Sequence, residues 1–307
     1  MVRAGSLSAY RFFDLTDEKG TLCARLLAGM GAEVIRIEAP GGDPTRNLGP
    51  FSGDILHPDK SLFFWQYNLS KRSITLNLQT EEGRSLFLKL VGKADGLVES
   101  HEPGYLEALG LGYSTLSARQ PGLVMASITP FGQDGPRRGW KACDLILAAL
   151  GGQAYLNGEP DTPPLKLYGN QTYHLASLYA TTGIFLALTH RRASGKGQYI
   201  DVSVQECVAS GLDHTLVRYF SEGVVSRRQG SQHWTRGFRL FPCRDGYVLL
   251  SLFRDWEVLV EWLESEGMAG DLTDEKWRSG ETRLDGMAHV VEVLEEWTRS
   301  HAAAELV

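Results

Sequence analysis

Residues 10–38, YRFFDLTDEKGTLCARLLAGMGAEVIRIE, decide the fold class of this chain. The apolar run Tyr10–Leu15 has the length of a buried strand, and from residue 22 to residue 30 apolar side chains recur at the three- and four-residue spacing of a helix. Gly31 ends that helix, and Glu33–Glu38 alternates as a strand does. Strand, helix and strand within about thirty residues form the unit that builds parallel sheets with right-handed crossovers.

The same alternation continues along the first 222 residues. The pattern predicts further strands over residues 73–76, 96–99, 123–128 and 199–202, and helices over residues 81–91, 142–150, 173–192 and 204–221. We therefore expect an α/β fold with a Rossmann-like, doubly wound sheet. Such sheets bind ligands at the carboxyl ends of their strands. The post-strand segments 16–20, 38–46, 99–104 and 129–135 are the expected site.

The pattern changes beyond residue 222. Two strand-like runs, Arg239–Pro242 and Tyr247–Leu252, flank an Asp-Gly turn, which is a strong hairpin signal. Helical patterns follow around residues 256–266 and 289–300. The prediction is a large domain over residues 1–222 and a smaller α+β domain over residues 223–307.

Composition excludes several classes of protein. Of 307 residues, 43% are hydrophobic and 22% charged, which is typical of a globular chain. The net charge of −6 argues against nucleic-acid binding. No apolar run approaches the ~18 residues of a membrane span, and no signal peptide is apparent, so we expect a cytoplasmic protein. The four cysteines and eight histidines show no metal-ligand spacing, which predicts that there is no metal site.

Several segments, taken together and in order, resemble family III CoA-transferases, the CaiB/BaiF family. The strongest is LLAGMGAEVIRIEAPGGD at residues 26–43, preceded by Asp14-Leu15-Thr16. SKRSITL at residues 70–76, FGQDGP at 131–136 and SGKGQ at 194–198 continue the match. The resemblance extends over essentially the whole chain.

The resemblance implies an interlocked dimer and a reaction. Such proteins move CoA from an acyl-CoA donor to a carboxylic acid, so coenzyme A or acyl-CoA is a substrate and no cofactor is permanently bound. An aspartate carboxylate is the expected nucleophile, through an anhydride and then an aspartyl-CoA thioester. Members return to the large domain at their C-terminus, and this chain is expected to lack that returning segment.

The chain departs from the family at the nucleophile. The resemblance places the nucleophile at a fixed spacing from two matching segments, Lys141 upstream and Ala180–Gly183 downstream. Counted without gaps from either segment, the nucleophile position falls on Tyr173, within GNQTYH at residues 169–174. This run holds no carboxylate, and a phenol with a pKa of about 10 does not replace one at neutral pH. We therefore expect no catalytic residue at this position.

The resemblance also implies CoA contacts. Lys141 matches a CoA-contacting lysine, Leu76 is expected against the adenine, and Lys71 and Arg72 toward phosphates. His101 lies in the expected site after a strand. Without the resemblance, we would interpret Lys141 as the ion-pair partner of Asp144, three residues further on at the start of a helix.

Three functions remain open at this stage. The first is a non-catalytic subunit of a hetero-oligomeric CoA-transferase acting on aryl-succinates such as benzylsuccinate, with a homologous partner subunit. The second is an active CoA-transferase or other CoA-thioester enzyme, as a homodimer or otherwise, whose nucleophile lies elsewhere, for example at Asp161 or Asp144. The third is a non-enzymatic CoA-binding scaffold.

Overall fold

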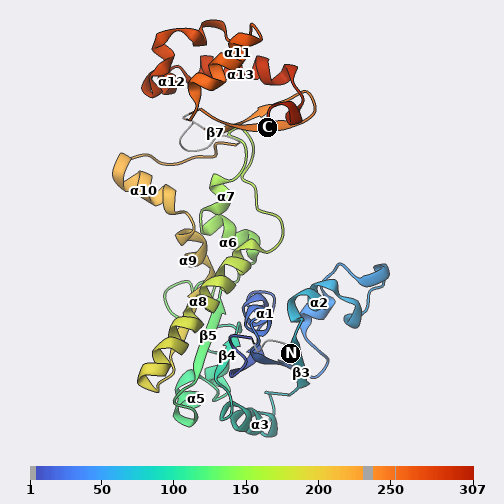
Figure 1. The fold of residues 1–307 in the computed structure, drawn as a ribbon. Coiled ribbons are helices and arrows are strands. Elements are labelled where there is room, and N and C mark those ends of the chain that lie inside the picture. Colours follow the sequence, from blue (N-terminus) through green and yellow to red (C-terminus); the bar gives the residue numbers. More distant parts are fainter. Residues whose placement is uncertain (1–4, 231–237, 253) are drawn as a thin grey trace. The chain divides into compact units, whose positions relative to one another are not determined.

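The chain forms two compact units in a computed structural model that describes residues 5–230, 238–252 and 254–307 (Figure 1). The first unit runs to Tyr155 and resumes over Lys166–Ser226. The second comprises Leu156–Leu165 and Arg227–Val307. The sequence assigns the segment 156–165 to the first domain, but it belongs to the second unit, where the Gly230 N–H donates to the Gly158 carbonyl at 3.1 Å.

A six-stranded parallel sheet forms the centre of the first unit. Its strands are β1 (Arg11–Leu15), β2 (Glu33–Glu38), β3 (Lys71–Thr75), β4 (Gly96–Glu99), β5 (Val124–Thr129) and β6 (Tyr199–Ser203). Their order is β3-β2-β1-β4-β5-β6, with all pairs parallel. This order confirms the predicted doubly wound α/β fold. The chain leaves β1 toward one edge and returns on its other side at β4, so the topological switch point lies between β1 and β4.

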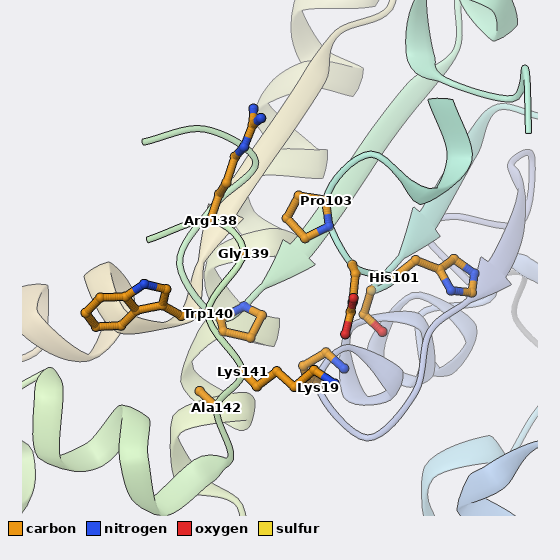
Figure 2. Close-up of a pocket in the computed structure, with 11 residues that line it drawn as sticks. Lys19, His101, Pro103, Arg138, Gly139, Trp140, Lys141 and Ala142 are labelled. Carbon is orange, nitrogen blue, oxygen red and sulfur yellow. The ribbon is translucent and has the colours of Figure 1, made fainter. Parts of the chain in front are cut away.

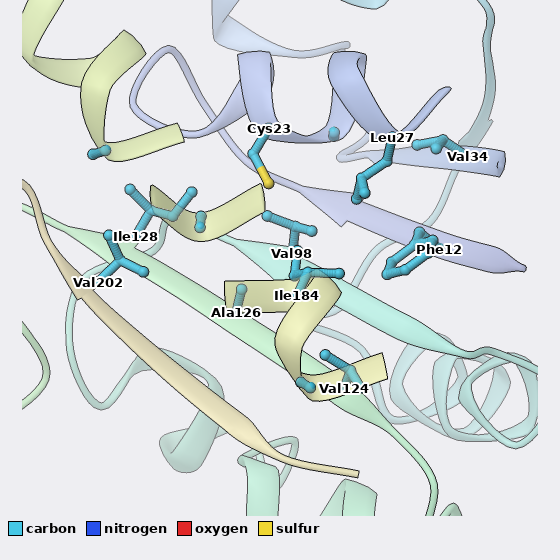
Figure 3. Packing of buried hydrophobic residues seen from close by; sticks show 14 of the residues in the cluster. Phe12, Cys23, Leu27, Val34, Val98, Val124, Ala126, Ile128, Ile184 and Val202 are labelled. Atoms are coloured by element: carbon cyan, nitrogen blue, oxygen red, sulfur yellow. The ribbon is translucent and has the colours of Figure 1, made fainter. Parts of the chain in front are cut away.

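Helices cover both faces of the sheet. The helices that follow β1 in this part of the chain, besides the one between β2 and β3, are α1 (Thr21–Gly29), α3 (Glu81–Val91), α4 (Tyr105–Ala108), α5 (Tyr113–Arg119), α6 (Asp144–Leu150), α7 (Gln153–Leu156), α8 (Gln171–Ser194), α9 (Val204–Ser210) and α10 (Asp213–Glu222). On one face, Leu27 of α1 and Ile184 of α8 pack on alternate strand residues such as Phe12 (Figure 3). On the other face, Phe87 of α3 packs with Phe13. Alternating side chains are buried on opposite faces because successive strand residues point to opposite sides.

Two local features differ from the sequence predictions. The single helix predicted over residues 204–221 is two helices, because Gly211 ends α9 with its N–H on the carbonyls of Cys207 and Val208. Between β2 and β3, where no element was predicted, the chain forms short 3₁₀ turns and α2 (Leu62–Asn68). Ser61 caps α2 by accepting from the Phe64 N–H at 3.0 Å.

The second unit is a hairpin packed on helices. Strands β7 (Phe238–Pro242) and β8 (Tyr247–Ser251) pair antiparallel, as the Asp-Gly turn predicted. Helices α11 (Trp256–Ser265), α12 (Gly280–Asp285) and α13 (Met287–Ser300) follow. Three tryptophans, Trp256, Trp277 and Trp297, are buried in its core with Phe241. Within the described ranges, no helix is long and apolar enough to cross a membrane.

Candidate functional site

A cavity of about 230 Å³ opens at the carboxyl ends of β1, β4 and β5, at the switch point of the sheet (Figure 2). Lys19 reaches it from the loop after β1, and Ser100 and His101 from the loop after β4. The segment Arg138–Ala142, which precedes α6, forms the opposite wall. This is the location at which doubly wound sheets bind ligands.

The walls of the cavity carry an excess of positive charge. Lys19, Arg138 and Lys141 line it, and Glu102 is the one acidic residue among the lining side chains. Lys19 is already paired with Asp17, whereas Arg138 and Lys141 form no ion pair within the described part of the chain. Two unpaired cations beside a cavity favour an anionic ligand.

The loop after β4 is held rigidly against the loop after β1. The Ser100 hydroxyl donates to the Asp17 carboxylate at 2.7 Å and accepts from the Asp17 N–H at 2.8 Å. The His101 ring packs against Tyr105 at a tilt of 31°, with ring centroids 4.4 Å apart, and points away from the Arg138–Ala142 wall (Figure 2). Burial lowers the pKa of His101, so this imidazole is neutral near pH 7.

Lys71 is buried inside the protein, whereas the resemblance implied that it contacts the phosphates of CoA. Its side chain is 1% exposed, and its ammonium donates to Asp14 at 2.8 Å, to Asn68 at 3.0 Å and to Thr21 at 3.1 Å. It begins β3 at the amino end of an edge strand, two strands away from β1. The ammonium contacts of Lys71 in this structure are all internal, so they do not support the phosphate contact, which stays a prediction.

Arg72 and Leu76 also lie on or just after the edge strand β3. The Arg72 side chain is 77% exposed and is paired with Glu33 at 3.0 Å. Leu76 is partly buried against the core on the α3 face. Neither residue lines the cavity that holds Lys141 and His101.

Tyr173 lies in the first turn of α8 and is 4% exposed. Burial, together with the negative charges of Glu18 and Asp17, raises the pKa of its phenol far above the ordinary value. The phenol is therefore neutral at any physiological pH, and it does not act as a nucleophile. It packs in the core with α1 and β6.

Asp144, the acidic residue nearest in sequence to the Arg138–Ala142 wall, has both carboxylate oxygens engaged by other residues of the fold. Asp144 accepts hydrogen bonds from the Thr172 N–H at 3.0 Å and hydroxyl at 2.7 Å, and its other oxygen lies 2.6 Å from the Lys166 ammonium. The pairing of Asp144 with Lys141 is therefore wrong, because Lys166, from the loop before α8, takes that place. This cluster fixes the start of α8 and with it Tyr173.

The sequence profile of CoA-transferase family III matches residues 18–307. The chain belongs to this family. The structure also resembles that of a CaiB/BaiF family protein from Brucella suis. The two chains have 30% sequence identity and a TM-score of 0.85, and the match covers 99% of this chain and 81% of the other. A hypothetical protein from Mycobacterium tuberculosis has 26% identity and a TM-score of 0.83, over 99% of this chain and 80% of the other.

Curated relatives carry CoA-transferase names. Subunit BbsE of succinyl-CoA:(R)-benzylsuccinate CoA-transferase from Thauera aromatica is 37% identical over 97% of this chain and 75% of its own length. Succinyl-CoA:mesaconate CoA-transferase from Haloarcula marismortui is 36% identical over 88% and 70%. The alpha subunit of succinyl-CoA–L-malate CoA-transferase from Chloroflexus aurantiacus is 33% identical over 98% and 71%. This family III chain is accordingly a transferase, and CoA thioesters are the substrates of its family.

Three cavity residues escaped the sequence analysis. Lys19 lies inside the post-strand segment that was expected to hold chemistry, but no motif distinguished it. Arg138 and Trp140 lie between the FGQDGP turn and Lys141, in a stretch without periodicity. Only the structure shows that these residues face one cavity. Among the described residues, no group of three or more histidine, cysteine, aspartate or glutamate side chains could hold a metal ion.

Proposed function

We propose that this chain is the non-catalytic subunit of a hetero-oligomeric family III CoA-transferase. A homologous partner subunit supplies the nucleophilic carboxylate and forms an interlocked dimer with this chain. The reaction transfers CoA between succinyl-CoA and an aryl-succinate of the benzylsuccinate type. Subunit names among the relatives, such as BbsE and the alpha and beta subunits of the malate enzyme, support a hetero-oligomeric assembly.

The observation that carries this proposal is the burial of the Tyr173 phenol, at the position where the resemblance leads us to expect the nucleophile. In the carboxylate mechanism, the nucleophile must reach the thioester carbonyl with its oxygen ionised. The phenol is 4% exposed and its pKa is raised, and Asp144 is tied to Lys166 and Thr172. Neither Tyr173 nor Asp144 thus offers a free carboxylate for the reaction.

The partner's carboxylate performs the chemistry in this proposal. It attacks the thioester carbonyl, forming a mixed anhydride and releasing CoA thiolate. The thiolate then attacks the enzyme-side carbonyl, which releases the donor acid and leaves an enzyme–CoA thioester. The acceptor carboxylate attacks that thioester, which forms a second anhydride and releases the CoA thiolate again. The thiolate then attacks the acceptor carbonyl of this anhydride, which gives the acceptor CoA thioester and frees the partner's carboxylate. In this chain, Arg138 and Lys141 serve to hold the anionic part of a CoA thioester.

The test is expression with and without the partner. The chain alone is expected to show no CoA transfer, and activity should appear when it is combined with a homologous subunit that retains the aspartate. Hydroxylamine treatment during turnover followed by peptide mapping should label the partner alone. Full activity of the isolated chain, or a label on Asp144 or Asp161, would refute the proposal in favour of a relocated nucleophile.

Tyr173→Phe and Tyr173→Asp form the matched pair of variants. Tyr173→Phe keeps the packing and removes the hydroxyl, so activity of the assembled enzyme should stay within about twofold of wild type. Tyr173→Asp tests whether the aspartate alone restores a site in this chain. If Tyr173→Phe abolishes transfer by a correctly assembled enzyme, the phenol has a catalytic role and the proposal is wrong.

A further inference from the structure

Five carboxyl groups are buried in the described residues, and Glu99 stands apart from the other four. Asp14, Glu38, Asp43 and Asp144 are each ion-paired with a lysine or an arginine. Glu99 is 3% exposed and has no ion pair within the described ranges. A buried carboxylate without a counter-charge is costly, so the fold must stabilise it otherwise or leave it protonated.

Polar groups from two neighbouring strands and from the following loop surround this carboxyl group. Glu99 ends β4, and its register partner on β5 is Ser127. Ser127 lowers the pKa of Glu99 and accepts a hydrogen bond from the Tyr199 hydroxyl of β6 at 2.9 Å. The result is a polar ladder across three neighbouring strands. The other contact is the His101 N–H, which donates to Glu99 Oε2 at 2.8 Å.

Glu99 adjoins the wall of the cavity. Glu99 immediately precedes Ser100 and His101, which line it, and the contact with the His101 N–H fixes the turn that carries both. The Glu99 carboxyl group is therefore linked directly to the cavity wall through the His101 N–H. Protonation of Glu99 leaves one oxygen to accept from the His101 N–H, so the turn is kept in both states.

The charged and titratable groups around Glu99 favour its neutral form. Burial is the largest influence and raises its pKa to about 7, and the charges of Glu107 and Asp17 act in the same direction. The bonds from Ser127 and the His101 N–H oppose them. The remaining neighbours are the paired ammonium of Lys19, the neutral imidazole of His101 and the neutral phenol of Tyr199.

We propose that Glu99 is a positioning residue that couples anion binding in this cavity to the uptake of one proton. An anion near Arg138 and Lys141 repels the ionised Glu99 carboxylate, so the complex takes a proton from solvent onto Glu99. By linkage, the affinity for the anion falls as the pH rises through neutrality. This inference rests on the proposed binding of a CoA thioester in the cavity.

Calorimetric titration with CoA in two buffers of different ionisation enthalpy measures the proton uptake directly. Between about pH 6 and about pH 8, we expect wild type to lose roughly fivefold in affinity if binding raises the pKa of Glu99 from about 7 by about one unit. The phosphate monoester of CoA titrates near pH 6 as well. The measured quantity is therefore the number of protons taken up on CoA binding by wild type minus the number taken up by Glu99→Gln. The contribution of Glu99 should be missing in this variant, whereas the contribution of CoA remains.

A measurement without ligand separates this inference from the proposed function. Infrared difference spectra of the free protein between about pH 6 and about pH 8 should show a protonated carboxyl carbonyl that Glu99→Gln removes and Ser127→Ala shifts. CoA binding with equal proton uptake in wild type and Glu99→Gln would overturn the coupling while leaving the proposed function intact. Absence of the carboxyl band in wild type would overturn it too. Absence of any CoA binding in a protein that shows the band would instead refute CoA binding by this chain.

Discussion

Replacement of Lys71 by methionine distinguishes a structural lysine from a ligand contact. Methionine fills a similar volume but removes the ammonium from Asp14, which is fully buried. Burial opposes ionisation of Asp14, but Lys71 and Arg36 outweigh it and hold the pKa of the carboxyl well below its usual range. Removing one partner of a buried ion pair costs about 3–5 kcal/mol, because a charge remains buried without compensation.

The expected cost is at the lower end of that range. Asp14 keeps Arg36 at 2.8 Å and the Thr16 N–H at 2.9 Å, so Lys71→Met should lower the free energy of unfolding by about 3 kcal/mol. For a unit of about 150–250 residues this corresponds to a Tm lower by about 6–12 °C. Thermal unfolding followed by circular dichroism and calorimetry measures it.

The neighbouring residue provides the control. Arg72 is also a cation of β3 with an acidic partner, but its side chain is largely exposed, so Arg72→Met should cost less than about 1 kcal/mol. The reasoning fails if Lys71→Met unfolds like Arg72→Met and weakens CoA binding instead. That result would show that the Lys71 ammonium faces a ligand.

Two further predictions concern the cavity and the acid stability of the fold. Lys141→Ala should weaken CoA binding by about ten- to a hundredfold, because a hydrogen bond to a charged group is worth about 1.5–3 kcal/mol. Calorimetric titration with CoA measures this loss. The control is Lys89→Ala on the exposed face of α3, which should bind CoA like wild type. The hydrogen bond from Arg46, with further donors, lowers the pKa of Glu38 from 4.5 to about 2. Its contribution to stability should therefore be complete above about pH 4.5 and vanish as the pH falls toward 2, and Glu38→Gln should flatten this part of the stability profile measured by urea unfolding.

The buried carboxyl groups illustrate why the chain tolerates so many charges in its core. Arg36 is 1% exposed and donates to Asp14 at 2.8 Å and to the Thr16 carbonyl at 2.7 Å, and it also binds Asp43. The loops after β1 and β2 are thereby tied to one guanidinium at the carboxyl end of the sheet. A fork of fixed donors suits this role better than a single ammonium does. The rigid loops in turn position Lys19 beside the cavity.

Local patterning was enough to predict most of the sheet. The strand Glu33–Glu38 and the helix Glu81–Val91 have the limits that the sequence indicated, because side-chain periodicity and capping residues such as Thr80 are local properties. The break at Gly211 and the short helix after Ser61 were not predicted. Helices of seven residues contain too few turns for a clear period, and a glycine inside a helical pattern ends the helix only in some contexts.

The sequence by itself determined the fold class, the family resemblance and the absence of a carboxylate at residue 173, because each depends on residues in short contiguous runs. Tertiary structure decided which charges are paired and which remain free for a ligand. Lys71 and Asp14 are 57 positions apart, and nothing local to either predicts their contact. Lys19, His101 and Lys141 likewise meet only because parallel strands bring their carboxyl ends to one edge of the sheet. Pairing and burial are sums over distant neighbours, and a linear pattern does not contain them.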